Sequence, residues 1–291
     1  MKIPESICNP KNRYDFVVLF DVQDGNPNGD PDAGNLPRVD PETMQGIVTD
    51  VCLKRKIRNY VDMAHESSDN TENDNGIFVR NSGIALNTKL KKASEEIGEK
   101  PNKKIANKNG REEMCRRYYD IRMFGGVLTT GDYNCGQVRG PMQLTFSRSI
   151  DPVIPSDLTI TRVAITKEGD EKETEMGRKA YIPYGLYRCY GFFSPSFAEQ
   201  TKVSAEDLNL FWEAVLGMFE NDRSASRGFM QLQGVYIFAH ENPLGNAPSG
   251  KLFERIFIKS NSETPRKFSD YTVEVSNQAL PSGVTMEPLL S

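Results

Sequence analysis

The chain has 291 residues, a formal net charge of −4 and 37% hydrophobic residues, which is typical of a globular protein with one elaborated domain or two ordinary ones. No stretch approaches the run of about 20 apolar residues that a membrane-spanning helix needs, and the first residues lack a secretory pattern, so we expect a cytoplasmic protein without a membrane partner. Five scattered cysteines and two histidines argue against a disulfide framework or a zinc site, and we expect no metal and no cofactor.

The first part of the chain predicts a strand, a long loop and a helix. Residues 14–22 (YDFVVLFDV) are a compact apolar run of β-forming residues and predict a buried strand. Residues 25–41 are too rich in proline and glycine for a helix or a regular strand, which predicts a long loop. From Glu42 onward, apolar residues at helical spacing predict a helix whose face becomes basic at Arg55 and Arg58.

The middle of the chain predicts a peripheral excursion and a projecting hairpin. Residues 65–75 are polar and predict a flexible connector, and the lysine-rich residues 87–111 predict a weakly helical insertion. β-forming residues fill 157–166 and 180–193, with a charged tip between them. This pattern predicts a long β-hairpin that projects from the body of the protein.

The last part of the chain predicts a second core helix followed by strands. Ser204–Asp207 has the pattern of a capping box, and the apolar residues from Leu208 to Phe219 then follow helical spacing. Strands are predicted at residues 229–240, 251–259 and 271–275. The order of elements along the chain predicts an α+β fold with a ferredoxin-like core that carries insertions.

A basic cluster ends the first predicted helix and has two interpretations. Lys54, Arg55, Lys56 and Arg58 would complement the helix dipole at its C-terminal end, which contributes about 0.3–1 kcal/mol per cation and needs no ligand. Arg55 and Arg58, however, continue the apolar stripe and would place guanidinium groups along a packed surface. This second feature favours an anionic partner.

The long loop before this helix allows several roles. Asp24–Asp30 matches the first half of a calcium-binding loop, but Asn35 stands where the bidentate glutamate belongs, and Pro27 and Pro31 stiffen the segment. Turn-forming composition alone would fit a surface connector. Loops of this length are usually functional or disordered, and asparagine side chains, backbone amides and Arg38 would suit a phosphate backbone.

Catalytic signatures are not evident in the sequence. His65 and His240 lie in contexts without a recognisable nucleophile or P-loop pattern. Arg227 opens a stretch that begins like an RNA-recognition signature, but Met230 and Gln231 replace its small and aromatic residues, so base stacking is not expected there. We therefore expect a binding protein that is not an enzyme.

One long stretch carries a family resemblance. Residues 20–60 (FDVQDGNPNGDPDAGNLPRVDPETMQGIVTDVCLKRKIRNY) closely resemble the N-terminal signature of the crRNA-binding backbone subunit of the type I-C CRISPR surveillance complex, Cascade, within the RAMP superfamily. Further stretches are similar to the same family at residues 123–126, 138–152, 175–195 and 224–243. The resemblance implies one elaborated domain over residues 1–291, with an RRM-like palm, a helical finger insertion at 62–120 and a β-hairpin thumb at 156–186.

The resemblance also implies a function in antiviral defence. Several copies would stack along the spacer of a CRISPR RNA, grip its backbone independently of sequence and present guide segments for pairing with a target DNA strand. Other partners would be the crRNA-processing, large and small subunits of Cascade. The alternative is a RAMP-type endoribonuclease that processes precursor CRISPR RNA, and a calcium-stabilised structural protein is a third hypothesis.

Candidate RNA-binding residues follow from motif position in the resembling stretches. They are Asn26, Asn28, Arg38, Lys54, Arg55, Arg58, Arg139, Gln143, Ser147, Arg148 and Arg227. Met176, in the implied thumb, is predicted to act as an apolar wedge at a displaced nucleotide. The resemblance implies no catalytic residue.

Overall fold

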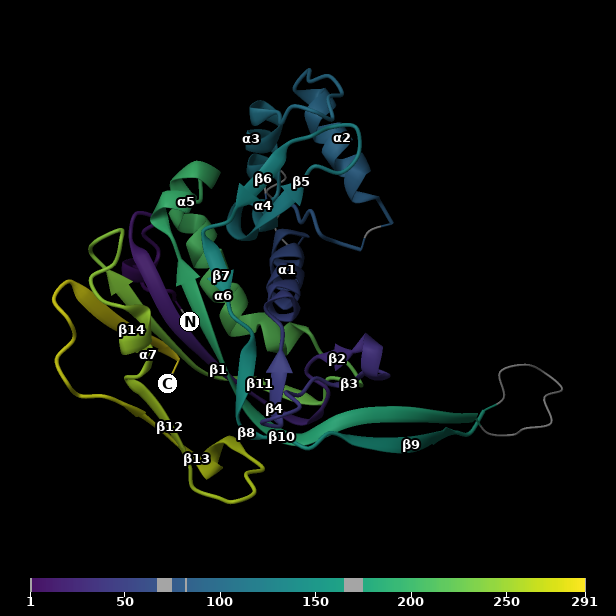
Figure 1. Ribbon diagram of the computed structural model, residues 1–291, viewed down its shortest axis with the longest axis vertical. Helices are drawn as coiled ribbons and strands as arrows, with labels where there is room; N and C mark the ends of the chain where they lie inside the picture. Colours follow the sequence, from purple (N-terminus) through teal and green to yellow (C-terminus); the bar gives the residue numbers. More distant parts are fainter. Residues whose placement is uncertain (1, 67–74, 82, 165–174, 291) are drawn as a thin grey trace.

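A central antiparallel sheet organises the protein, with helices packed against it (Figure 1). The computed structural model describes residues 2–66, 75–81, 83–164 and 175–290. The strand order is β14–β11–β1–β10–β8–β4, and β7 and β9 also pair with β10. These strands are β1 Arg13–Gly25, β4 Gln45–Val48, β7 Met142–Leu144, β8 Ser147–Pro152, β9 Ser156–Arg162, β10 Glu175–Phe193, β11 Phe229–His240 and β14 Val284–Leu290. The predicted α+β class is confirmed.

Strand β1 lies at the centre of the sheet and supplies both of its faces. Phe16 and Val18 contribute to the hydrophobic cluster on one face, whereas Val17 and Leu19 contribute to the cluster on the other. All four are buried because β10 and β11 pair along the two edges of β1. The strand predicted at residues 14–22 is confirmed.

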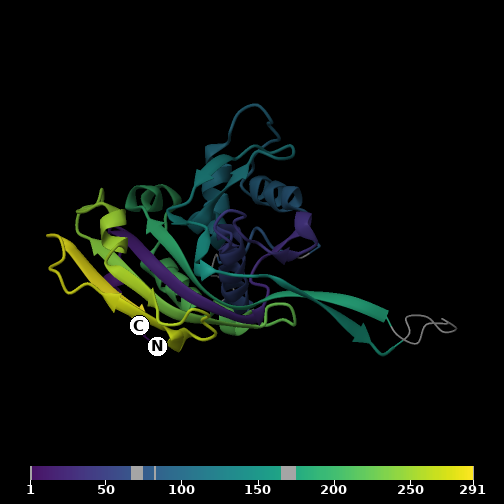
Figure 2. The ribbon, with the colours of Figure 1, turned by 60° about the horizontal axis from the view of Figure 1, so that its bottom comes forward.

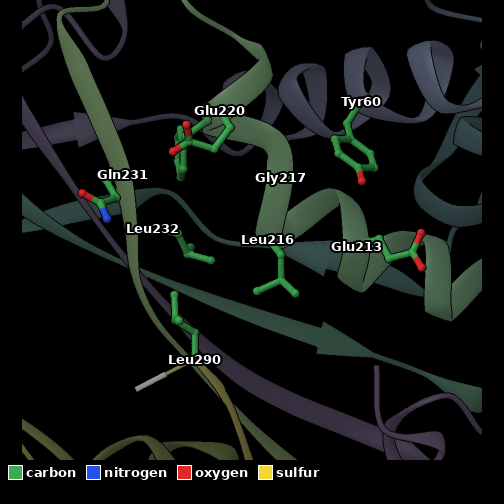
Figure 3. A pocket seen from close by; sticks show the side chains of 9 residues that line it. Tyr60, Glu213, Leu216, Gly217, Glu220, Gln231, Leu232 and Leu290 are labelled. Carbon is green, nitrogen blue, oxygen red and sulfur yellow. The ribbon is translucent and has the colours of Figure 1, made fainter. Parts of the chain in front are cut away.

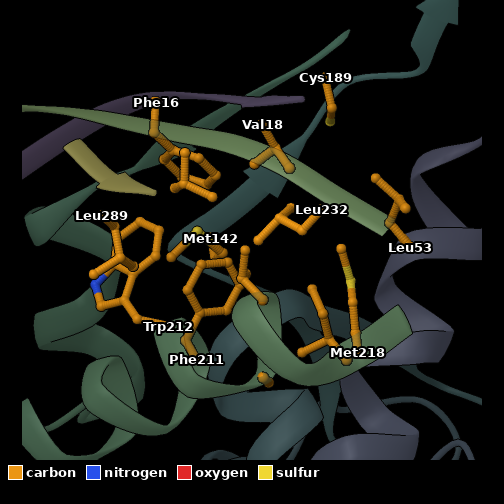
Figure 4. Close-up of a cluster of buried hydrophobic side chains, with 14 of the residues drawn as sticks. Phe16, Val18, Leu53, Met142, Cys189, Phe211, Trp212, Met218, Leu232 and Leu289 are labelled. Atoms are coloured by element: carbon orange, nitrogen blue, oxygen red, sulfur yellow. The ribbon is translucent and has the colours of Figure 1, made fainter. Parts of the chain in front are cut away.

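Four helices contribute buried residues to the main core on one face of the sheet, namely α1 (Asp50–Glu66), α4 (Tyr119–Phe124), α5 (Pro195–Thr201) and α6 (Ala205–Asn221). The ring of Trp212 in α6 meets that of Phe16 edge-on at 5.1 Å between centroids, and Figure 4 shows this contact inside the core. Ser204 Oγ accepts a hydrogen bond from Asp207 N (3.2 Å), and the Asp207 carboxylate accepts one from Ser204 N (2.9 Å). The predicted capping box and helix are therefore confirmed.

The helix predicted from Glu42 begins only at Asp50, so its predicted start was wrong. The preceding residues form β4, which pairs with β8 at the edge of the sheet. Ile47 and Val48 are β-branched and suit an extended strand. Their spacing matches a helical stripe equally well, and pairing with a segment about a hundred residues away decides in favour of the strand.

A small helix and a hairpin cover the opposite face of the sheet. They are α7 (Ser249–Phe253) and the strands β12 (Ile256–Ser260) and β13 (Tyr271–Val275). The single strand predicted at 251–259 is thus divided between α7 and β12. The helical turn lets Leu252 and Phe253 both reach the sheet, whereas a strand would send them to opposite faces.

A buried polar cluster fastens α7 to the sheet. His240 Nε2 lies 3.1 Å from Asp15 Oδ2, Ser249 Oγ donates to the same oxygen at 2.7 Å, and Arg13 donates to both carboxylate oxygens. Burial by itself would raise the pKa of Asp15, but the hydrogen bonds from His240, Arg13 and Ser249 hold it below its usual value. Because Nδ1 of His240 accepts a hydrogen bond from the N–H of Asn246 (2.9 Å), the ring proton is on Nε2, which donates a hydrogen bond to Asp15.

A second, smaller core lies above α1 (Figure 1). Its elements are α2 (Leu86–Glu96), α3 (Lys108–Arg117), α4 (Tyr119–Phe124), β5 (Gly125–Leu128) and β6 (Gly136–Arg139). Leu90, Met114 and Tyr133 are among the apolar side chains that it buries. The lysine-rich segment predicted as weakly helical thus forms α2 and the start of α3, and we call the unit 75–139 the finger region.

The pH dependence of stability should reveal one ion-pair cluster in this region. Hydrogen bonds from Arg116 and Arg117 lower the pKa of Glu113 from 4.5 to about 2. A carboxylate with a depressed pKa contributes stability above its unfolded pKa and loses it as the pH falls toward its folded pKa. The Glu113→Gln variant should therefore unfold at a lower urea concentration than the wild type above pH 4.5, and the difference should shrink toward pH 2.

The neighbouring Glu112 provides the control. Its side chain is exposed, and its ion pair with Lys108, at 3.7 Å, lies in solvent. Glu112→Gln should have little effect at any pH. A stability difference for Glu113→Gln that stays constant between about pH 6 and about pH 3 would contradict the assignment.

Strands β9 and β10 form a hairpin that projects far from the body (Figure 2). The charged tip predicted between them and the connector predicted at 65–75 lie mostly outside the described residues. Four short elements complete the first loop and the N-terminus, namely η1 (Glu5–Ile7), β2 (Gly29–Asp30), η2 (Pro31–Ala33) and β3 (Leu36–Pro37), and η3 (Phe268–Asp270) precedes β13. Within the described residues, no helix is both long and apolar enough to cross a membrane.

Candidate nucleic-acid interface

A groove of about 1310 Å³ lies between the first loop, α1 and the finger region. Six of the predicted residues line it: Asn26, Asn28, Arg38, Arg55, Arg58 and Arg227. Arg80 adds a fifth arginine, and Asp62 is the one acidic side chain among the described lining residues. The groove therefore has the positive lining that a polyanion requires.

The first loop owes its shape to its asparagines. Asn26 N donates to Ser226 O (2.8 Å), and its side-chain amide donates to Asn35 O (2.7 Å). Asn28 Oδ1 accepts from the backbone N–H and the hydroxyl of Thr49, both at 3.0 Å, directly before α1 begins. The loop predicted as irregular is therefore an ordered wall of the groove that contains the two-residue strands β2 and β3.

The arginines of the groove differ in how they are held. Arg58 Nε lies 2.8 Å from Asp120, a buried carboxylate that also accepts the backbone N–H groups of Phe78 and Val79. Arg38 lies 3.4 Å from Asp30. Arg55 is exposed, and within the described part of the chain no hydrogen bond or ion pair to its side chain is seen. Its charge is the most available of the set.

Arg227 enters the groove from the turn between α6 and β11. Its Nε lies 3.2 Å from Asp222, and its Nη1 donates to Pro27 O at 3.0 Å. Gly228 has φ of 64°, and a Cβ on Gly25 would lie 1.9 Å from the carbonyl oxygen of Arg227. Glycine is thus required at residue 25 for the turn to approach the first loop so closely.

The remaining predicted residues do not line the groove. Lys54 pairs with Asp50 (2.9 Å) and approaches Gln143 (3.5 Å). Arg139 is exposed on β6, and Arg148 pairs with Asp40 at 2.8 Å. Ser147 is fully buried, so its hydroxyl does not reach a surface in this conformation. Met176 is 83% exposed on β10, where it pairs with Thr161 of β9. Roles in RNA binding for these residues stay predictions.

Two parts of the groove escaped sequence analysis. Arg80 forms ion pairs with Asp62 (2.8 Å) and Glu66 (2.6 Å), which tie the finger region to α1. Burial raises the pKa of Asp62 against the lowering effect of Arg80. Aliphatic side chains that stay 40–62% exposed also line the groove, namely Val51, Val79, Ile84 and Leu86. Arg80 lies within a basic stretch of the sequence, but no periodicity distinguishes it there.

A second cavity of about 560 Å³ lies between α1, α6 and β11 and has a different character (Figure 3). Its lining includes Glu213, Glu220 and Tyr60, and none of the predicted binding residues. Its acidic side chains do not suit a phosphate. Among the described residues, no three His, Cys, Asp or Glu side chains gather as a metal site.

Known proteins resemble this chain in sequence and in fold. The family model for CRISPR-associated protein Cas7 matches residues 12–276. The CRISPR-associated protein Cas7 of Haloferax volcanii is 27% identical over 291 residues, covering 91% of this chain and 81% of that protein. A chain of a CRISPR RNA-guided surveillance complex in a pre-nicking state has a similar fold, with a TM-score of 0.50, 14% identity and 78% of each chain covered. The protein belongs to the CRISPR-associated Cas7 family.

Proposed function

We propose that the protein is the crRNA-binding backbone subunit of a type I-C Cascade. The observation that carries the proposal is the groove, which places Arg38, Arg55, Arg58, Arg80 and Arg227 along one concave surface. Membership of the Cas7 family and a fold shared with a chain of an RNA-guided surveillance complex support it. The subunit repeats along the spacer of the CRISPR RNA.

The lining of the groove suits the RNA backbone rather than its bases. No aromatic side chain occurs among the described residues that line it, and aromatic rings are what RNA-binding surfaces usually stack bases upon. Arginines contact phosphates without reading sequence. A subunit with this lining accepts any spacer sequence. This suits a protein that leaves recognition of the target to the guide RNA.

The proposal includes further partners but no catalysis. The guide segments pair with a target DNA strand, neighbouring copies stack on each other, and the crRNA-processing, large and small subunits complete the complex. The endoribonuclease alternative gains no support from His240, because that side chain is buried between Asp15 and Asn246 on the far side of the sheet from α1. We propose that Met176 on the exposed hairpin is the apolar wedge at a displaced nucleotide.

Binding to RNA as a function of salt concentration tests the proposal. Single-stranded RNAs of unrelated sequence should bind with similar affinity, measured by fluorescence anisotropy. Each phosphate contact contributes about 0.7 to the slope of log affinity against log salt for a single strand. The Arg55→Ala variant should therefore have a slope smaller by about 0.7, with unchanged stability because the side chain is exposed.

The matched control is Arg266→Ala, which removes an exposed arginine between β12 and β13. Its slope should equal that of the wild type. A wild-type protein that binds no RNA, or that prefers one sequence strongly, would refute the proposed function. An equal loss for both variants would mean that only total charge matters and that the groove is not the binding surface.

A further inference from the structure

Lys56 is a buried cation in a position where an apolar residue would be expected. Its side chain is 2% exposed on α1, beside the buried Ile57, and its ammonium group lies 5.7 Å from the ring of Phe219. Burial lowers the pKa of Lys56. Apolar residues of similar volume often replace buried ion pairs without loss of stability, so packing alone does not account for a lysine here.

The partner of Lys56 is Asp222, the residue that follows α6. The same carboxylate oxygen that pairs with Lys56 also lies 3.2 Å from Nε of Arg227. One negative charge is thus shared by two positive charges. Lys56 approaches Asp222 from the interior, whereas Arg227 approaches it from the groove, where its side chain remains 26% exposed.

We propose that Lys56 is a positioning residue for the RNA groove, which neutralises Asp222 from inside the protein and so leaves the positive charge of Arg227 for a phosphate. The three side chains carry a net charge of +1 with Lys56 and of zero without it. In the absence of Lys56, Asp222 compensates Arg227 alone. The inference rests on the proposed function, because it assigns a role in the same groove.

Contacts that do not involve Lys56 hold the turn that carries Arg227. Asn26 N donates to Ser226 O at 2.8 Å, and Arg227 Nη1 donates to Pro27 O at 3.0 Å. The close approach of Gly25 to the carbonyl of Arg227 leaves no room for a side chain between the two loops. Because these contacts do not involve Lys56, its replacement should change the charge of the groove without moving the turn.

The test compares Lys56→Met with Arg227→Ala in binding to a polyuridine oligonucleotide. Lys56→Met should bind as weakly as Arg227→Ala, and its salt slope should fall by about 0.7 although residue 56 is buried. Lys56→Gln keeps a hydrogen-bond donor for Asp222 but removes the charge, so it should show the same loss. Its inclusion keeps the test valid if Lys56→Met folds poorly.

The double variant Lys56→Met/Asp222→Asn separates charge from packing. It restores the net charge of +1 at Arg227, so its affinity and slope should return to wild-type values. Wild-type binding by both single variants at Lys56 would overturn the inference, and so would a double variant that stays as weak as Lys56→Met. Either result would leave the proposed function intact as long as Arg55→Ala still lowers the salt slope. A wild-type protein that does not bind the oligonucleotide would overturn both the inference and the proposed function.

Discussion

Replacing Asp207 with alanine is expected to lower the free energy of unfolding by about 3–5 kcal/mol, because it removes the carboxylate that balances a buried cation. Arg122 in α4 donates two hydrogen bonds to this carboxylate, from Nε to Oδ2 at 2.9 Å and from Nη2 to Oδ1 at 2.6 Å. Both side chains are less than 10% exposed. The same guanidinium donates to the carbonyl oxygens of Cys115 and Arg116. The pair therefore joins the finger region to α6.

Urea denaturation at neutral pH measures this effect, with Glu206→Ala as the matched control. Glu206 is the exposed neighbour of Asp207 in the first turn of α6, so its loss should cost less than about 1 kcal/mol through the helix dipole. If Asp207→Ala cost no more than Glu206→Ala, the buried pair would contribute little to stability. Arg122→Met/Asp207→Ala should recover part of the loss, since no buried charge then remains unpaired.

Removing three groove arginines together should nearly abolish RNA binding. In the triple variant Arg38→Ala/Arg55→Ala/Arg227→Ala, three charged hydrogen bonds are lost, each worth about 1.5–3 kcal/mol. Since about 1.4 kcal/mol is a factor of ten, affinity should fall about a thousandfold or more, and the salt slope should fall by about 2. Arg58 is left in place because its removal would take the ion-pair partner from the buried carboxylate of Asp120.

A charge-matched control removes three exposed cations from the layer that covers the opposite face of the sheet: Lys251, Lys259 and Arg266. Those distant charges are screened by salt, so this variant should bind RNA nearly as well as the wild type. Similar losses for the two triple variants would show that binding depends on net charge and not on the groove. Unfolding curves of both variants should show that each is folded under the conditions of the binding assay.

Local sequence signals predicted the elements whose structure is decided locally. The apolar run at 14–22 has one stable arrangement, a strand with neighbours on both sides, and the capping box at Ser204 fixes where α6 begins. Strand β14 and the strand at Ile47 have no such local signal, because each is stabilised by pairing with a distant strand. Their existence depends on the edges that the folded sheet leaves open.

The groove was predictable only where its residues are close in sequence. The first loop precedes α1 with the short strand β4 between them, so Arg38 and Arg55 of the groove come from neighbouring segments of the sequence. Arg227 joins them from a distant turn, and its placement came from family resemblance rather than from any pattern. Lys56 looked like the other basic residues of its cluster, and only its burial against Asp222 separates it from Arg55.

The length of β10 gives one strand two different environments. It runs for 19 residues, or about 60 Å at about 3.3 Å per residue. From Ile182 to Phe193 it lies beside β1 in the sheet, whereas from Met176 to Tyr181 it pairs with β9 and none of its residues is buried. A strand of this kind opens to solvent from its outer end without loss of the core. The hairpin is joined to the sheet through both of its arms, since β10 continues beside β1 and β9 follows β8 of the same sheet, so a load applied to the hairpin reaches the sheet along two strands.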